Sequence, residues 1–535
     1  MSRVWIYDTT LRDGTQGEGI SLTVDDKLKI ATHLDKLGVD YIEAGWPGSN
    51  PKDLEFFQRC HTLQLTHAKI TAFGSTRRVG INVEDDPNLQ SLIAANTDVI
   101  TIYGKTWSFQ VEEALRTSLE SNLELIYDSV RYLKSFNREV IFDAEHFFDG
   151  YKQNQEYAIS CLLEAQRAGA DSIVLCDTNG GSLPHEIAAA VTDVCGKLQV
   201  PVGIHTHNDG ELAVANSLVA VSAGATHIQG TINGFGERCG NANLCSILPN
   251  LMLKMGKQCL RAKEDLALLT STAHYVSEIA NVPPSRSQPF VGASAFAHKA
   301  GMHVNAIAKN PETYESISPD QVGNHRRILI SELSAGDNLV YKANELGFQV
   351  DRQNPKTRKM LQEIKDLEYK GYQFESAEAS LELLIYETFA PEADRFELLS
   401  FRVTSERSPM QESLAEAQVT LRINSHVFRS TATGLGPVNA LDHAMRKALA
   451  TEYPSVNSTH LVDYKVRVLD GSDGTAAKVR VLIETTNGVH SWTTIGVSEN
   501  IIEASCEALV DSFEYFLIKF DAKHARGELA ESVSV

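Results

Sequence analysis

Short apolar runs alternate with longer amphipathic stretches over the first half of the chain. Most of the runs are followed by a stretch with helical spacing, which is typical of βα units. The strand-like runs begin near Val4, Tyr41, Lys69, Val99, Val140, Ser172, Val202 and His227. Eight such units in about 255 residues predict a (β/α)8 TIM barrel, whose active site lies at the carboxyl ends of the strands.

The alternative of an open doubly wound sheet is disfavoured by the residues that follow the first run. Residues 8–14 read DTTLRDG, whereas the first βα turn of such a sheet usually carries a glycine-rich dinucleotide loop. Several helix-to-strand junctions also repeat one pattern, a glycine followed by a polar turn residue, as in Gly38-Val39-Asp40. Glycine at this place is typical of the residue that ends a helix. Its repetition indicates a repeated βα unit, which supports the barrel.

The alternation of strand-like and helical stretches ends after Met255, and with it the barrel pattern. Pro283, Pro284 and Pro289 break regular structure soon afterwards. The following residues are first loop-rich and then polar with helical spacing, which predicts helical linker subdomains. We therefore expect a catalytic barrel over 1–275, linker subdomains over 276–390 and a C-terminal domain over 391–535.

The C-terminal domain repeats one order of elements. Three strand-like runs and a helix opened by residues 434–437 are followed by three more runs and a helix opened by residues 496–499. The order predicts an α+β domain of two βββα units. A regulatory domain that binds a small ligand at the glycine-rich helix starts and a plain dimerisation module both fit this pattern.

Net charge and cysteine content limit the classes of protein to which this chain can belong. The 49 Lys and Arg residues against 69 Asp and Glu residues give a net charge of −20, which disfavours broad nucleic-acid binding. The eight cysteines form no Cys-x-x-Cys pair and read as reduced thiols. No apolar run is long enough for a signal core or a membrane span, so we expect a cytoplasmic protein without a membrane partner.

The best candidate for chemistry is a pair of histidines at the end of the seventh run. His205 and His207 share one face of a strand because side chains alternate with a period of two. Asp13 follows the first strand, which neighbours strands seven and eight in a closed barrel. These three residues predict an open site for a divalent cation, to which Asn241 after strand eight can add an oxygen. A hydrogen-bonded polar layer is the alternative for the two histidines.

Arg12 carries a permanent positive charge at the carboxyl end of the predicted barrel, where the other charged side chains are carboxylates. It can bind a substrate carboxylate or an oxygen that becomes negative in the transition state. An ion pair with Glu43 is the alternative, and the two roles are compatible because such a pair would orient the guanidinium. Thr178 offers a hydroxyl at the same end of the barrel, after strand six.

Four motifs in order resemble the alpha-isopropylmalate, homocitrate and citramalate synthases, which are metal-dependent TIM-barrel acyltransferases. These are DTTLRDGTQ at 8–16, IEAGWP at 42–47, HTHN at 205–208 and GERCGN at 236–241. Residues 434–440 and 496–504 resemble paired elements of the family's regulatory domain. Within the family, residues 99–105 and 142–150 are most similar to the citramalate synthase branch.

The resemblance implies a transferase that condenses acetyl-CoA with pyruvate to give citramalate and CoA, in isoleucine biosynthesis. The alternatives are a 2-isopropylmalate synthase that acts on 2-oxoisovalerate and a non-catalytic amino-acid sensor. The resemblance further implies a divalent cation (Mg, Mn or Zn), isoleucine as feedback inhibitor, and a homodimer or higher homo-oligomer.

The resemblance also implies roles for particular residues. The strand-five carboxylate can be Asp143 or Glu145, of which we favour Glu145. Thr15 stands where many family members have Glu. The implied metal ligands are Asp13, His205, His207 and Asn241; the catalytic residues are Arg12, Glu145, His303 and Tyr314; the substrate-binding residues are Arg12, Glu43, Tyr103 and Thr178. Candidate partners of the CoA phosphates are Lys105, Lys299, Arg326 and Arg327.

Overall fold

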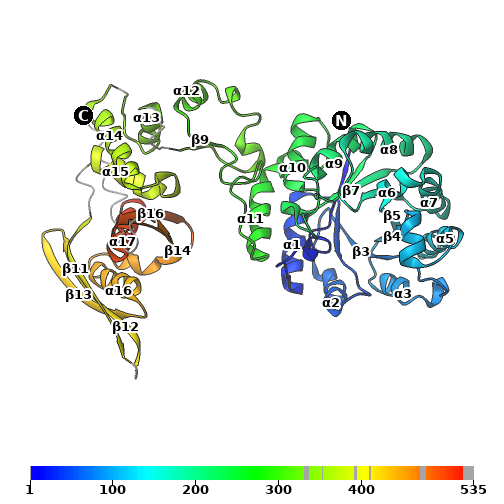
Figure 1. The fold of residues 1–535 in the computed structure, drawn as a ribbon, viewed down its shortest axis with the longest axis horizontal. Helices are drawn as coiled ribbons and strands as arrows, with labels where there is room; N and C mark the ends of the chain where they lie inside the picture. Colours follow the sequence, from blue (N-terminus) through cyan, green and yellow to red (C-terminus); the bar gives the residue numbers. More distant parts are fainter. Residues whose placement is uncertain are drawn as a thin grey trace. The chain divides into compact units, whose positions relative to one another are not determined.

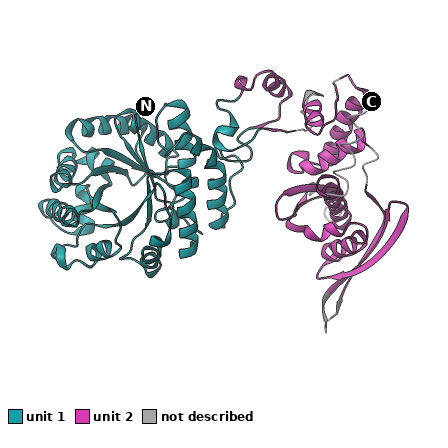
Figure 2. Ribbon diagram, turned by 180° about the vertical axis from the view of Figure 1, so that it is seen from behind, with its two compact units in different colours: residues 1–296, 315–326 teal, residues 297–314, 327–535 magenta. Residues whose placement is uncertain are grey.

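The chain forms two compact units in a computed structural model that describes residues 2–329, 336–351, 353–390, 395–408, 411–469 and 477–521. One unit comprises Met1–Phe296 with Glu315–Arg326, and the other comprises Ala297–Tyr314 with Arg327–Val535 (Figure 2). The expected boundary at 390/391 borders residues 391–394, which lie outside the described ones, so the division into three parts stays a prediction. Within the described ranges, no helix is long and apolar enough to cross a membrane.

A closed barrel of eight parallel strands forms the centre of the first unit, as the sequence predicts (Figure 1). The strands follow one another in chain order, and β1 closes the barrel by pairing with β8, from Trp5 opposite His227 to Asp8 opposite Gly230. Their bounds are β1 Trp5–Asp8, β2 Tyr41–Gly45, β3 Lys69–Ser75, β4 Val99–Lys105, β5 Glu139–Glu145, β6 Ser172–Asp177, β7 Val202–Thr206 and β8 His227–Gly230.

Helices surround the barrel, and their ends follow the repeated junction pattern. Gly38, Asn96, Gly169 and Gly224 all have positive φ, the backbone that ends a helix before the next strand. The helices are α1 Val24–Leu37, α2 Pro51–Arg59, α3 Pro87–Ala94, α4 Ser108–Gln110, α5 Leu119–Ser135, α6 Phe147–Gln153, α7 Gln155–Ala168, α8 Pro184–Lys197, α9 Ala213–Ser222, α10 Leu244–Pro249 and α11 Leu269–Ile279.

The core of the first unit extends past the predicted end of the barrel. Val291, Ile317 and Val322 belong to the same buried apolar cluster as the barrel strands and the helices around them. The Thr270 hydroxyl of α11 donates to the Val322 carbonyl at 2.7 Å. Residues 315–326 therefore return to the barrel unit and pack on α11.

Short helices precede the C-terminal sheets in the second unit, and these agree with the expected helical linker. The apolar faces of three of these helices, those that contain Leu339, Met360 and Ile385, share one cluster. The elements are β9 Ala297–His298, α12 Gly301–Lys309, β10 Arg327–Ile328, α13 Gly336–Glu345, α14 Pro355–Lys370 and α15 Glu378–Phe389.

Two βββα repeats complete the second unit, which confirms the predicted α+β domain. Each repeat has an antiparallel three-stranded sheet, and the two helices share one apolar core with the sheets. The elements are β11 Phe396–Ser408, β12 Gln411–Ile423, β13 His426–Gly434, α16 Pro437–Leu449, β14 His460–Val468, β15 Val479–Thr486, β16 Ser491–Ser498 and α17 Ile501–Phe520.

The glycines expected at the two helix starts lie in strands instead. Gly434 is the last residue of β13 and Gly496 pairs with Val481 inside β16. A Cβ on Gly496 would lie 2.0 Å from the carbonyl oxygen of Ala504, so the glycine lets the strand approach α17 closely. Residues 434–437 open a helix as predicted, since Gly436 is the N-cap of α16 and Pro437 its first residue. Gly434 and Gly496 themselves do not start helices, and ligand binding by N–H groups at these places stays a prediction.

Candidate metal centre and active-site cavity

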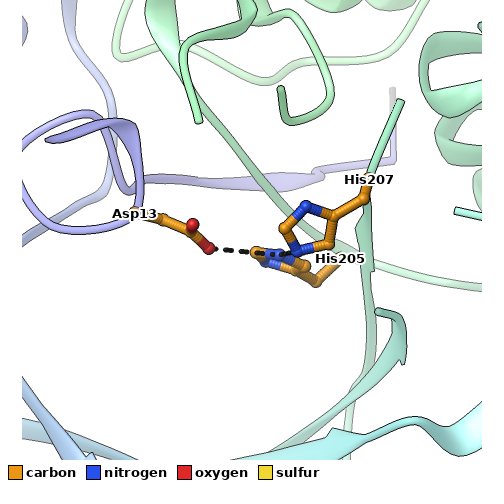
Figure 3. Close-up of side chains that lie close together, drawn as sticks. All are labelled: Asp13, His205 and His207. Carbon is orange, nitrogen blue, oxygen red and sulfur yellow. Dashed lines mark hydrogen bonds and ion pairs between the residues drawn. The ribbon is translucent and has the colours of Figure 1, made fainter. Parts of the chain in front are cut away.

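Asp13, His205 and His207 converge at the carboxyl end of the barrel (Figure 3). Their ligand atoms lie within 4.8 Å of one another. His205 Nε2 is 3.3 Å from His207 Nε2 and 3.5 Å from Asp13 Oδ2. Two imidazoles and a carboxylate that leave positions open are a common arrangement for a catalytic divalent cation.

The electrostatics keep these groups in the states that bind a cation. Burial favours the neutral form of Asp13, but Arg12 and the two histidines outweigh it and hold the pKa of the carboxyl below its usual value. Burial, followed by the effect of His205, lowers the pKa of His207 to about 4. At neutral pH the site thus offers an ionised carboxylate and an unprotonated imidazole at His207.

Asn241 belongs to the loop after β8 and pairs with His207 through an isolated β-bridge. Its Nδ2 donates to the carbonyl of Phe235 at 3.1 Å. Its Oδ1 is buried without a hydrogen-bond partner in the described structure. An unpaired buried amide oxygen is costly, and a bound cation would satisfy it. The donor set therefore fits a divalent metal ion.

Arg12 is held in place from three sides. Its Nε donates to Glu43 Oε2 at 2.6 Å, and its Nη1 lies 3.3 Å from Asp13 Oδ2. The guanidinium carbon is 3.7 Å from the centre of the Phe73 ring, a cation–π contact. Burial opposes the charge, but Glu43 and Asp13 raise the pKa of Arg12 above its ordinary value.

Glu43 lies beneath the site, fully buried. Its two oxygens accept hydrogen bonds from the hydroxyls of Tyr7 and Thr9 as well as from Arg12. It does not line the cavity at the mouth. The expected ion pair with Arg12 is thus present, and Glu43 reaches the cavity only through Arg12.

A cavity of about 250 Å³ opens over the candidate metal ligands. Tyr103, Glu145 and Thr178 line it together with Arg12, as does the alternative carboxylate Asp143. Burial and the nearby Glu145 raise the pKa of Tyr103 to about 12. Asp143 is buried, and its pKa lies well above its usual value, first through burial and then through Glu43.

Other contacts fix the polar groups of the wall. Glu145 forms an ion pair with Lys105. Thr178 Oγ1 accepts the backbone N–H of His146 at 2.9 Å. The remaining candidate CoA-binding cations are also paired, Lys299 with Glu375, Arg326 with Glu315 and Arg327 with Glu378.

His303 and Tyr314 belong to the second unit. His303 lies on α12, and the two exposed rings stack with centroids 4.1 Å apart. The structure brings these two residues together, and Arg12 and Glu145 lie in the other unit. Their catalytic roles stay predictions.

Two residues near the metal centre escaped the sequence reasoning. Phe73 of β3 lines the cavity beneath Arg12, and Gln229 of β8 contacts His205. Both lie within strands, where the sequence alone assigns an aromatic or amide side chain to the packed interior and not to a functional site. Their place near the carboxyl end of a barrel strand is the one signal that points to them.

Comparison with known proteins defines the class of this barrel. The HMGL-like family matches residues 3–276, the homocitrate synthase post-HMGL domain-like family matches 290–371, and the LeuA allosteric (dimerisation) domain matches 375–517. The first match covers more than half of the chain and contains all four candidate metal ligands. The protein is thus a condensing enzyme of the HMGL-like type with a LeuA-type C-terminal domain.

The similarity to curated relatives extends along the whole chain. An (R)-citramalate synthase of Geobacter sulfurreducens is 54% identical over 97% of this chain and 98% of the relative. One of Aquifex aeolicus is 53% identical over the same shares. A 2-isopropylmalate synthase of Methanocaldococcus jannaschii is 31% identical over 97% of this chain and 95% of the relative. The chain belongs to the citramalate synthase branch of the isopropylmalate and homocitrate synthase family.

Proposed function

We propose that this chain is an (R)-citramalate synthase, which condenses acetyl-CoA with pyruvate to give citramalate and CoA. The proposal is carried by the Asp13, His205 and His207 cluster beside Arg12 at an open cavity. Five curated citramalate synthases are 46–54% identical to this chain, and two 2-isopropylmalate synthases only 29–31%. These similarities favour pyruvate over 2-oxoisovalerate as acceptor.

Asp13, His205 and His207 would hold the divalent cation, with Asn241 Oδ1 as a further oxygen ligand. When bound, the cation supplies Lewis-acid activation of the keto acid's carbonyl group. Imidazole ligands suit Zn²⁺, while the carboxylate and amide oxygens also suit Mg²⁺ and Mn²⁺. Metal replacement in chelator-treated protein, read by restored turnover, distinguishes the three.

Arg12 would stabilise the oxygen of pyruvate that becomes an alkoxide when the new C–C bond forms. Glu43 accepts from its Nε, and Asp13 Oδ2 lies 3.3 Å from its Nη1, so Nη2 would be the part of the fork that serves the substrate. Since Glu43 and Phe73 already fix the guanidinium, little reorganisation is needed during the reaction.

Glu145 is the favoured base that takes a proton from the methyl group of acetyl-CoA, either directly or through a water molecule. The resulting enolate attacks the carbonyl carbon of pyruvate, and hydrolysis of the thioester then releases citramalate and CoA. His303 is the alternative base. A Glu145→Gln variant that binds pyruvate normally and releases no thiol would support Glu145.

The acceptor is tested by a keto-acid panel in which free thiol release is measured. One or two methylenes change transition-state binding by about 1–3 kcal/mol in such a pocket. We expect kcat/KM for pyruvate to exceed that for 2-oxoisovalerate. The opposite preference would identify a 2-isopropylmalate synthase, and absence of thiol release with every acceptor would leave the amino-acid sensor.

We further propose that His303 and Tyr314 serve the barrel of a neighbouring subunit, so that the working site is composite. The LeuA-type domain supports a homodimer or a higher homo-oligomer. Mixing a His303→Ala chain with a His207→Ala chain should restore part of the activity. Verified mixed dimers without activity would count against a shared site.

Feedback inhibition by isoleucine is the third part of the proposal. It is supported by the match of residues 375–517 to the LeuA allosteric domain and by the isoleucine pathway that citramalate would feed. A coupling of about 1–3 kcal/mol between the two sites is enough for inhibition. Turnover of the full chain is measured against isoleucine, with leucine as control; absence of both binding and inhibition would leave a dimerisation module.

A further inference from the structure

Gln229 lies inside the barrel, directly beside the candidate metal centre. It belongs to β8, is fully buried, and pairs in register with His205 of β7. Its Oε1 is 2.8 Å from His205 Nδ1, and its Nε2 donates to Asp143 Oδ1 at 2.9 Å. One amide therefore joins a candidate metal ligand to a carboxylate on β5.

We propose that Gln229 is a positioning residue that fixes His205 as a metal ligand through its Nε2 atom. An amide oxygen can only accept a hydrogen bond, so it requires the proton of the neutral imidazole to be on Nδ1. The Nε2 lone pair is then free, and Nε2 is the atom that faces Asp13 and His207.

Asp143 determines which way the amide points. If the Gln229 amide were turned over, its oxygen would face the Asp143 carboxyl group and its NH₂ would face Nδ1 of His205. The first of these contacts would lose the hydrogen bond that Gln229 Nε2 donates to Asp143 Oδ1, and the second favours the His205 tautomer whose Nε2 carries a proton and cannot bind a metal ion. The Asp143–Gln229 hydrogen bond thus selects the tautomer of His205 from the opposite side of the barrel.

The two histidines differ in this respect. His207 Nδ1 is buried and has no hydrogen-bond partner in the part of the chain that the structure describes. The orienting contact therefore acts on His205 alone. Since Gln229 is fully buried, water cannot readily replace its amide, and loss of such a partner typically weakens metal affinity by about 10- to 100-fold.

The test measures the dissociation constants of Mn²⁺ and Zn²⁺ by calorimetry in Gln229→Met, which keeps the volume and removes the amide. We expect affinity to fall by about 10- to 100-fold. The matched control is His227→Gln, two residues away on the same inward face of β8, where the buried ring contacts Ser172. This control should leave metal affinity unchanged.

Three outcomes would overturn the inference. They are wild-type affinity in Gln229→Met, an equal loss in His227→Gln, and equal affinities of Gln229→Met and the wild-type protein after chelation and return of the metal. The inference rests on the metal role in the proposed function. A wild-type protein that binds neither metal would refute that role and the inference together, whereas tight wild-type binding with an unaffected Gln229→Met would refute the inference alone.

Discussion

Replacement of Arg12 by lysine keeps the positive charge and removes the planar fork. In the wild-type protein, Arg12 Nε donates a hydrogen bond to Glu43 Oε2 at 2.6 Å, and Nη1 lies 3.3 Å from Asp13 Oδ2. A lysine has one ammonium group in place of these separate nitrogens. Because the Glu43 carboxylate is fully buried, we expect the ammonium to pair with Glu43 and to be lost to the substrate.

The contacts of Arg12 predict different costs for the free energy of unfolding and for catalysis in the two variants. Removal of one partner from a buried ion pair costs about 3–5 kcal/mol, so Arg12→Ala should destabilise the barrel. Arg12→Lys should avoid most of this cost, since Glu43 keeps a cation. Loss of a donor to the developing oxyanion lowers kcat by about 10²–10³-fold, or roughly 2.7–4 kcal/mol.

The assay combines thiol release at saturating pyruvate with thermal unfolding and metal titration. We expect Arg12→Lys to unfold near the wild-type temperature, to bind the metal, and to have a strongly reduced kcat. Near-normal turnover in this variant would show that Arg12 is only a structural partner of Glu43. A loss of fold in Arg12→Lys, equal to that in Arg12→Ala, would refute the division of roles.

Three further predictions concern other parts of the chain. His207→Ala should abolish metal binding and turnover while circular dichroism stays unchanged, and chelator-resistant activity in this variant would refute the metal assignment. Burial lowers the pKa of His227 to about 3. Its contribution to the free energy of unfolding is therefore full above about pH 6.5 and is lost as the pH falls toward 3, with a total of about 5 kcal/mol. Urea unfolding of His227→Gln should accordingly depend less on pH over this range, and an unaltered pH profile would refute this. Gly496→Ala should lower the unfolding temperature of the second unit by overpacking against Ala504, at a cost of about 1–3 kcal/mol. The control is Gly436→Ala, where no atom lies within 4 Å of the new methyl group. Equal unfolding temperatures in the two variants would contradict the clash.

The sequence predicts the barrel well because each βα unit repeats the same local signals. Six of the eight predicted strand starts coincide with the observed ones, and Val4 and Val140 differ by a single residue from β1 and β5. The cluster of Asp13, His205 and His207 is predictable for the same reason, since strand ends meet at one face of a barrel. Local pattern and barrel topology are sufficient for both.

What the sequence does not predict depends on contacts between distant residues. Gln229 contacts Asp143 across the barrel, and nothing near either residue in the chain indicates this hydrogen bond. Gly496 reads as a helix start because Ser and Glu follow it, yet its role is to let β16 approach α17. The return of residues 315–326 to the first unit has no local signal either.

That return has a consequence for the order in which the chain folds during synthesis. Val322 belongs to the buried core of the first unit and accepts a hydrogen bond from α11. Gly323 lies so close to Ala267 that a side chain would collide with its carbonyl oxygen. A nascent chain therefore has to expose residue 326 outside the ribosome before its catalytic unit can bury the outer face of α11. Until then that face is an apolar surface on which a chaperone can act.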